Sequence, residues 1–328
     1  MLLMACLSGC VGLAPRPCPA FPPVAERDFL IIGHKGAPYQ ACENTLESFS
    51  QALALGANAL EMDVSMTRDG HLVLWHDAID SLVNQGRPTG LCHLVQPLQR
   101  RPIYELTLAE FNRDYGYERQ GQRVAVTTLA AFVRQFARDA RLRYFFLDLK
   151  LTEAQAYQVP HLFTSAMQIL RPFGGVPKAV FTTPYEAIFT PFAEAAQHWY
   201  RTTGQQVALA FDTEGPQGIL LGDWPSAVQR NQSAGTRFAL WGQPVITFQS
   251  SYAFLTQEVQ RRDAINATRP AQERLRFIVW TLNDQDDLCA AVGLGVDGII
   301  TDEPGRLRHL VTQRHPGAFS VHSAAPGP

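Results

Sequence analysis

Short apolar runs alternate with amphipathic stretches along most of this chain. The run Phe29–Gly33 (FLIIG) ends in glycine, as a buried parallel strand does. The next stretch, Asn44–Leu55, carries apolar side chains near helical spacing, with Asn44 or Thr45 as its N-cap and Gly56 as its stop. The pattern therefore predicts a strand followed by a helix.

Further segments of both kinds follow. Besides Phe29–Gly33, buried strands are predicted at Ala57–Val64, Arg143–Leu149, Ala179–Thr182, Val207–Phe211, Pro244–Phe248, Phe277–Thr281 and Gly298–Thr301. Besides Asn44–Leu55, helices are predicted at Thr107–Arg113, Thr128–Arg138, Tyr185–Tyr200, Phe254–Arg262 and Asp284–Val292. Strand–helix alternation with short buried strands favours a parallel sheet covered by helices. Eight such strands predict an α/β fold, a closed (β/α)8 TIM barrel.

One long segment departs from this alternation. The turn at Asp69-Gly70 supplies the positive φ of a tight reversal, so His71–Trp75 is predicted to run back as a hairpin strand. Residues 80–123 are then polar and irregular, and too long for a simple connection. We expect an insertion there, after the hairpin of the second strand, positioned to fold over the site.

Composition narrows the class of protein. The chain has 328 residues, of which 46% are hydrophobic, so it can bury a large core. Its net charge is −2, without the clustered basic residues that nucleic-acid binding requires. Charged residues make up 18%, which is not the composition of a disordered chain.

The two ends differ from the rest, which gives three regions: residues 1–23, 24–314 and a flexible tail, 315–328. Met1–Leu13 is apolar, uncharged and too short to span a membrane, and a proline-rich tether follows it. Leu7-Ser8-Gly9-Cys10 resembles a bacterial lipobox, in which the cysteine is cleaved and lipidated. On that interpretation Cys10 tethers the protein to a membrane of the cell envelope or periplasm. The alternative is an ordinary apolar N-terminus, since no Lys or Arg precedes the run.

The six cysteines show no Cys-x-x-Cys spacing, so they support neither a zinc site nor a redox motif. A Cys42–Cys92 bridge is conceivable in an oxidising compartment. Reduced, mostly buried thiols are the default expectation.

Carboxylates occur where predicted strands end. Glu61 and Asp63 are two residues apart on a strand, so both side chains point to one face. Two carboxylates inside a barrel are costly unless a cation pairs with them, and a hard divalent ion such as Mg²⁺ or Ca²⁺ is the natural partner. Asp148 adds a third carboxylate from a neighbouring strand. The alternative is an exposed strand edge, or pairing with Lys and Arg.

Two histidines also follow apolar runs. His34 and His76 can take or give a proton near neutral pH, which suits an acid–base pair. A lone histidine at a strand end is more often structural, but both of these lie beside the candidate metal carboxylates. Asp77 either orients His76 or caps a turn.

These residues belong to an ordered series of short motifs. The series runs Gly33-His34-Lys35-Gly36, Glu43-Asn44-Thr45, Glu61-Met62-Asp63, Thr67-Arg68-Asp69-Gly70, Trp75-His76-Asp77, Asp148-Leu149-Lys150, Trp280-Thr281-Leu282-Asn283 and Gly295 to Pro304. It resembles the glycerophosphodiester phosphodiesterase family, from Phe29 to Leu310. The resemblance implies a TIM barrel with its active site at the carboxyl ends of the strands. It also implies metal ligands at Glu61, Asp63 and Asp148.

The chain departs from the family pattern at two of these positions. The family usually has Glu where this chain has Asp148, which leaves open direct ligation or ligation through a water. The family usually has Arg at Lys35, and Lys offers the phosphate a point charge in place of a bidentate grip.

Three further residues are candidates for substrate binding, and each also has a second possible role. Lys150 is a second cation for the phosphate or a salt-bridge partner of the carboxylates. Glu43 ligates the metal or holds Lys35. Trp280 is an apolar wall for the substrate or a core residue.

The resemblance implies metal-dependent hydrolysis of a glycerophosphodiester to glycerol 3-phosphate and an alcohol. Two alternatives remain at this point. One is a phospholipase D of the sphingomyelinase type, acting on a lysolipid. The other is a catalytically impaired, membrane-tethered binding protein. Under each of these three interpretations the protein binds a small phosphodiester and does not bind nucleic acid.

Overall fold

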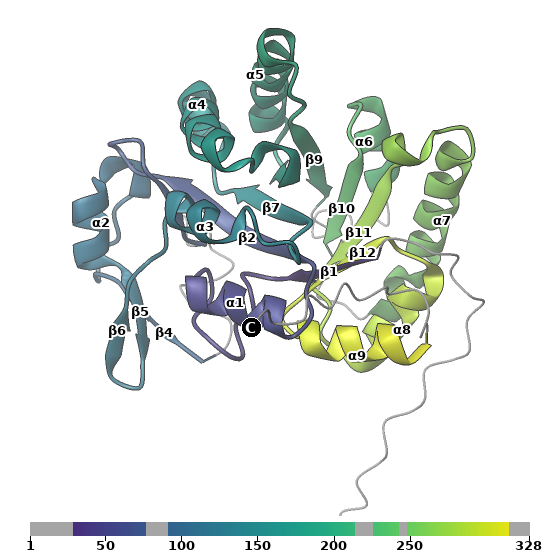
Figure 1. Ribbon diagram of the computed structural model, residues 1–328, viewed down its shortest axis with the longest axis horizontal. Helices are drawn as coiled ribbons and strands as arrows, with labels where there is room; N and C mark the ends of the chain where they lie inside the picture. Colours follow the sequence, from purple (N-terminus) through teal and green to yellow (C-terminus); the bar gives the residue numbers. More distant parts are fainter. Residues whose placement is uncertain (1–28, 77–90, 214–225, 243–247, 315–328) are drawn as a thin grey trace, which may run out of the picture.

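Parallel strands form a closed barrel in this computed structural model, which describes residues 29–76, 91–213, 226–242 and 248–314 (Figure 1). The barrel strands are β1 (Leu30–Gly33), β2 (Ala59–Met66), β7 (Tyr144–Leu149), β8 (Ala179–Thr183), β9 (Ala208–Thr213), β10 (Phe238–Gly242), β11 (Arg276–Trp280) and β12 (Gly298–Thr301). Their order is β1-β12-β11-β10-β9-β8-β7-β2, and pairing of β2 with β1 closes the ring. The expected TIM barrel is confirmed.

Alternation along the strands separates two cores. Inward side chains such as Ile32, Phe146 and Ile278 fill the barrel interior. The intervening side chains, such as Ile31 and Phe145, pack outward beneath the helices in the main core. Because the side-chain period of a strand is two, the residue two positions beyond an inward apolar residue also points inward. At the end of a strand, that residue lies at the carboxyl end of the barrel.

Helices cover the barrel. They are α1 (Leu46–Ala54), α3 (Leu129–Phe136), α4 (Val159–Leu170), α5 (Glu186–Thr203), α6 (Ala227–Ser233), α7 (Phe248–Asn266), α8 (Gln285–Leu294) and α9 (Pro304–Arg314), with short 3₁₀ turns at Glu153–Gln158, Arg171–Phe173, Val176–Lys178 and Ala271–Glu273. Thr45 is the N-cap of α1, where its side chain accepts from the Ser48 N–H. Within the described parts of the chain, no helix has the length and apolarity to span a membrane.

The insertion is a separate small layer on one side of the barrel (Figure 1). Strand β3 (Leu72–Leu74) runs back along β2, as the hairpin predicts. The chain then forms β4 (His93–Val95), a 3₁₀ turn (Ile103–Glu105), α2 (Leu108–Asp114), β5 (Gly116–Arg119) and β6 (Gln122–Val124). The three strands pair antiparallel, and Trp75, Phe111 and Tyr117 give the insertion a small core of its own.

The cysteines correct one expectation. Cys42 and Cys92 form a disulfide, so the expectation of reduced thiols is wrong for this pair. Cys289 is disulfide-bonded as well. The Cys42–Cys92 bond ties the loop between β1 and α1 to the start of the insertion.

One barrel strand does not lie where it was expected. Residues 244–247 of the predicted strand Pro244–Phe248 lie outside the described residues, and Phe248 begins α7. The barrel strand of this unit is β10, which begins at Phe238, six residues before Pro244. The apolar run after Pro244 has strong β propensity, but β10 is the segment that fits between β9 and β11.

Several expectations fall on parts of the chain that the structure does not describe. They concern the 1–23 leader with Cys10, Asp77, the first residues of the insertion and the 315–328 tail.

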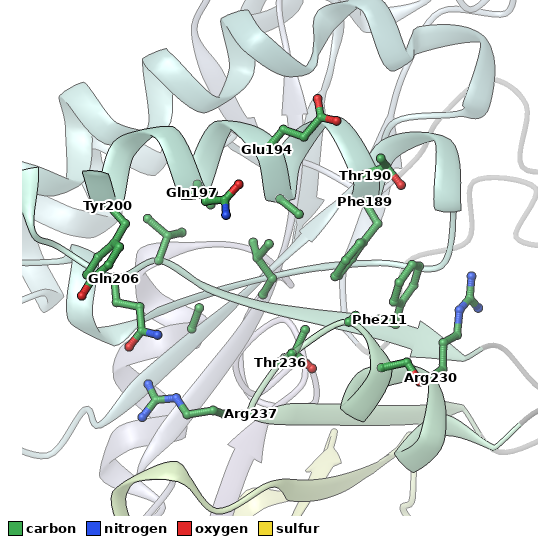
Figure 2. A pocket seen from close by; sticks show the side chains of 18 of the residues that line it. Phe189, Thr190, Glu194, Gln197, Tyr200, Gln206, Phe211, Arg230, Thr236 and Arg237 are labelled. Atoms are coloured by element: carbon green, nitrogen blue, oxygen red, sulfur yellow. The ribbon is translucent and has the colours of Figure 1, made fainter. Parts of the chain in front are cut away.

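A groove of about 810 Å³ lies outside the barrel, between α5 and α6 (Figure 2). Phe189 and Phe211 stack within it, and the Arg230 guanidinium lies over the Phe211 ring. None of the candidate site residues lines this groove, so it is separate from the barrel mouth.

Candidate active site

The inward positions become polar at the carboxyl ends of the strands. Each polar residue follows an inward apolar residue by two positions, at His34, Glu61, Asp148, Thr182, Asp212 and Asp302. This spacing directs side chains from many strands into one space at the barrel mouth. The site residues predicted on β1, β2 and β7 are therefore brought together.

Three carboxylates form a compact group. Asp63 and Asp148 are paired residues on the neighbouring strands β2 and β7. One oxygen from each of Glu61, Asp63 and Asp148 can be chosen so that all lie within 4.8 Å of one another. Glu61 and Asp63 are buried, and Asp148 is partly exposed.

This group fits a divalent metal ion. Its donors are all carboxylate oxygens, the ligands that hard cations prefer. Burial, and then the charge of Asp63, raise the pKa of Glu61 to about 8, so the nearby cations do not fully offset the negative charge. A divalent ion held by Glu61, Asp63 and Asp148 would supply that charge.

Two lysines surround the carboxylates. Lys150 Nζ lies 3.0 Å from Asp63 Oδ1 and also contacts Asp148. Lys35 Nζ lies 3.7 Å from Glu43 Oε2 and 3.9 Å from Asp63 Oδ2. Burial acts to lower the pKa of both lysines, but the carboxylates outweigh it and raise both values. The lysines are therefore charged at neutral pH, and Glu43 lies against Lys35.

The turn after β1 fixes Lys35. Lys35 adopts a left-handed φ of 52°, and Gly36 follows with a φ of 92°. A Cβ at Gly36 would lie 2.4 Å from Ser48 Oγ, so only glycine fits beneath α1. In this conformation the Lys35 backbone N–H donates to Glu61 Oε2 at 3.0 Å. The same turn thus holds a candidate metal ligand.

His34 is oriented by a carboxylate. Its Nδ1 lies 2.6 Å from Asp302 Oδ1, and its Nε2 lies 3.9 Å from Glu61 Oε2. Burial acts to lower the pKa of His34, but Asp302 and then Glu61 outweigh it, so the value is raised. The Asn283 amide donates to the other Asp302 oxygen at 2.6 Å. Because ionised Asp302 can only accept, Nδ1 carries a proton and Nε2 faces the carboxylate group.

His76 interacts electrostatically with the carboxylate of Asp63. It follows β3 and is partly exposed. Burial acts to raise the pKa of Asp63, but Lys150 and then His76 outweigh it and lower the value. The Asn44 amide donates to Asp63 Oδ2 at 2.7 Å and its oxygen accepts from the Asp63 N–H at 3.2 Å. Asp63 is thus held from several sides.

Trp280 lies at the end of β11 and is partly exposed. Its ring packs on the barrel interior, and its Nε1–H donates to Asp212 Oδ1 at 2.7 Å. The packing fits the predicted core role of Trp280, and its role as a wall for the substrate stays a prediction.

Sequence reasoning assigned no chemical role to Asn44, Asp212, Asn283 or Asp302. Asn44 was considered only as a helix cap. The period-two spacing from Ile300 to Asp302, and from Ala210 to Asp212, is the signal that identifies the two carboxylates as inward-facing.

Comparisons with known proteins agree with this geometry. Residues 34–170 match the model of the glycerophosphoryl diester phosphodiesterase family. A glycerophosphodiester phosphodiesterase of Caldanaerobacter subterraneus is 45% identical over 56 residues, which span 17% of this chain and 23% of that protein. A mouse lysophospholipase D is 23% identical over 302 residues, covering 87% of this chain and 82% of that protein.

A solved structure shares the fold. The phosphodiesterase of Oleispira antarctica, in complex with the product sn-glycerol-3-phosphate, superposes with a TM-score of 0.57 at 19% identity. The match covers 85% of this chain and 95% of that one.

Proposed function

We propose that the chain is a member of the glycerophosphoryl diester phosphodiesterase family and a phosphoric diester hydrolase, as the match of residues 34–170 and the similarity to glycerophosphodiester phosphodiesterases support. In this proposal it hydrolyses glycerophosphodiesters to glycerol 3-phosphate and an alcohol, with a divalent ion and the pair His34 and His76. The observation that carries the proposal is the position of His34, held by Asp302 with its Nε2 3.9 Å from Glu61. A candidate base thus faces a candidate metal group at the barrel mouth.

His34 supplies the base. With Nδ1–H donating to Asp302, its Nε2 accepts the proton of the attacking hydroxyl. If water attacks, glycerol 3-phosphate forms directly; if the substrate glycerol attacks, the alcohol leaves from a cyclic phosphate, which a water then opens to glycerol 3-phosphate. Asp302 then stabilises the imidazolium that forms, as carboxylates do in other histidine-dependent hydrolases. The Asn283 amide keeps the carboxylate in place.

The remaining residues bind the phosphate and release the alcohol. Lys35 and Lys150 stabilise the charge that develops on the phosphoryl oxygens. His76, which interacts electrostatically with Asp63, protonates the leaving alkoxide. When bound by Glu61, Asp63 and Asp148, the ion would add Lewis acidity toward the phosphodiester.

The experiment measures release of glycerol 3-phosphate from glycerophosphocholine, with and without a chelator, and after adding back Mg²⁺ or Ca²⁺. We expect the chelator to abolish turnover and one of the metals to restore it. His34→Ala and His76→Ala should each lower kcat by about 10²–10⁴-fold. His198→Ala, which removes an exposed histidine on α5, is the control. Full activity in either site variant would contradict its assigned role.

A second candidate is supported by the similarity to a lysophospholipase D. Such an activity would release choline from lysophosphatidylcholine faster than from glycerophosphocholine, so comparing the two rates decides between the substrates. Metal binding without turnover of either would favour the binding-protein alternative. The membrane tether through Cys10 remains a separate proposal, tested by labelling with a radioactive fatty acid and by loss of the label in Cys10→Ala.

A further inference from the structure

Asn44 is a fully buried amide at the barrel mouth to which the proposed reaction gives no role. It lies in the loop between β1 and α1, two positions before the first residue of α1, and is 0% exposed. Its Nδ2 donates to Asp63 Oδ2 at 2.7 Å, and its Oδ1 accepts the Asp63 N–H at 3.2 Å. One side chain thus holds both the carboxylate and the backbone of a candidate metal ligand.

This two-point contact takes the place of a neighbouring strand beside β2. Strand β1 pairs with β2 at Ala59 and Leu60, and β3 pairs with it from Val64 onward. Asp63 lies between these two pairings, so its N–H bonds to the Asn44 side chain. Any acceptor would satisfy that N–H, but an acceptor alone would leave the Asp63 carboxylate free to turn. The donor half of the amide therefore needs a separate explanation.

The backbone of Asn44 is held so that the amide faces Asp63. Its φ is 57°, in the left-handed region that asparagine tolerates better than most residues. Its N–H donates to the Lys35 carbonyl at 3.0 Å, and the same carbonyl accepts the Ser48 hydroxyl at 2.9 Å. The turn at Lys35 and the helix α1 together fix the position of the amide.

The same two-point contact occurs a second time in the barrel. Asn283 Nδ2 donates to Asp302 Oδ2 at 2.6 Å, and Asn283 Oδ1 accepts the Asp302 N–H at 2.8 Å. In both pairs the asparagine precedes the aspartate by 19 residues and lies two positions before a helix, α1 or α8. The second contact holds the carboxylate that orients His34. The first indicates an equivalent role toward the metal group.

The Asp63 carboxylate needs such a partner because cations compete for it. Lys150 Nζ lies 3.0 Å from its Oδ1, and Lys35 Nζ lies 3.9 Å from its Oδ2. Lysine is a point charge on a flexible stem, so the two lysines attract the carboxylate without fixing its plane. The short hydrogen bond from Asn44 does fix it. Partners that contact a ligand in this way typically change metal affinity by about 10–100-fold.

We propose that Asn44 is a positioning residue for metal binding. It holds the Asp63 carboxylate in the direction in which Asp63, Glu61 and Asp148 can share one divalent ion. The inference rests on the proposed function, because it takes this group as the binding site of the ion. Asn44 acts through Asp63 and takes no part in proton transfer.

The first test measures affinity for the ion and does not depend on activity. Calorimetry on the full chain gives the Kd of Mg²⁺ and of Ca²⁺. Asn44→Gly removes both hydrogen bonds and keeps the left-handed backbone without strain. We expect the Kd of the ion that binds the wild type to rise by about 10–100-fold. A Kd within about twofold of the wild-type value would overturn the inference.

Asn58→Gly is the matched control. Asn58 directly precedes β2, at the amino end of the barrel, and its side chain also makes two hydrogen bonds: it accepts the Ile31 N–H at 2.9 Å and donates to the Phe29 carbonyl at 3.0 Å. Its loss should lower the free energy of unfolding and leave the Kd of the ion within about twofold. An equal rise of Kd in both variants would mean that Asn44 only supports the fold, which overturns the inference.

Asn44→Ser is a second variant, for the case in which the glycine variant does not fold. The serine hydroxyl is shorter and can serve the Asp63 N–H or the Asp63 carboxylate, but it cannot reach both. We expect a Kd about fivefold above that of the wild type, the factor that one lost hydrogen bond supplies. Wild-type affinity in this variant would contradict the positioning role.

The two proposals fail in different ways. If the wild type binds the ion and hydrolyses glycerophosphocholine but the Asn44 variants keep its affinity, the positioning role is wrong and the proposed function stands. If the wild type binds neither Mg²⁺ nor Ca²⁺, both are wrong.

Discussion

Asp302 sets the chemical state of His34. The carboxylate lies 2.6 Å from Nδ1 and is itself fixed by the Asn283 amide and by its own backbone N–H, which donates to Asn283 Oδ1 at 2.8 Å. A histidine at the end of a strand would otherwise be free to present either ring nitrogen. The orientation of this candidate base therefore depends on a residue that lies 268 positions away in the sequence.

We predict that Asp302→Asn lowers kcat by about 10²–10⁴-fold, because the Asn amide can donate to Nδ1 and leave the proton on Nε2. Affinity for the divalent ion, measured by calorimetry, should be unchanged, since Asp302 lies outside the group of Glu61, Asp63 and Asp148. Asp302→Glu, which keeps the charge, should retain more activity. A kcat within twofold of wild type in Asp302→Asn would rule out this role.

At the scale of elements, the sequence predicts what depends on local pattern. The eight barrel strands were expected from short apolar runs, and seven lie where expected. The exception is β10, because two apolar runs compete there and only the neighbouring strands decide between them. Helices α4, α6 and α9 were not among the predicted segments.

For the candidate site, too, the sequence predicted the residues whose positions depend on local pattern. His34, Glu61, Asp63 and Asp148 stand beside apolar runs, so their positions follow from spacing alone. The roles of the Asn44 and Asn283 amides depend on contacts between consecutive strand units, with Asp63 and Asp302 respectively, each 19 residues away. Local pattern does not predict these contacts, because they form when the neighbouring strands pair.

The loop from β1 to α1 is held by the Cys42–Cys92 disulfide. This loop carries Lys35, Glu43 and Asn44, which all contact the carboxylate group or its neighbours. The covalent bond joins it to the insertion across a sequence separation of 50 residues.

We predict that the double variant Cys42→Ala/Cys92→Ala is less stable by up to about 4 kcal/mol, the loop-closure value for a separation of this size. Its KM should rise, because the loop that positions Lys35 gains freedom. Urea unfolding and steady-state kinetics measure the two effects. Unchanged stability and unchanged KM together would show that packing alone holds the loop. The double substitution leaves Cys289 intact, so the result reports on this bond.

At the scale of the whole molecule, the carboxyl end of the barrel carries the candidate site, and the amino end contributes to stability. The carboxyl end holds buried carboxylates, lysines and His34 at close range, which is costly for stability. The amino end carries a buried ion pair with good hydrogen bonding. Arg262 of α7 is 1% exposed, contacts Asp297 and donates to the Gly295 carbonyl at 3.0 Å. Asp297 Oδ2 also accepts the Phe277 N–H at 2.9 Å, so the pair joins α7 to β11 and β12.

Because Arg262 lies at the opposite end of the barrel from the candidate site, we predict that Arg262→Ala lowers the free energy of unfolding and leaves kcat unchanged. Removing the guanidinium leaves the partly buried Asp297 without its cation, which costs at most about 3–5 kcal/mol. Arg141→Ala, which breaks an exposed pair with Asp139, should cost less than about 1 kcal/mol and serves as the control. The free energy of unfolding comes from urea titration, and kcat is measured where both variants are folded. A drop in kcat there would show that the amino end of the barrel is coupled to the site, because a local stability defect leaves the folded fraction fully active.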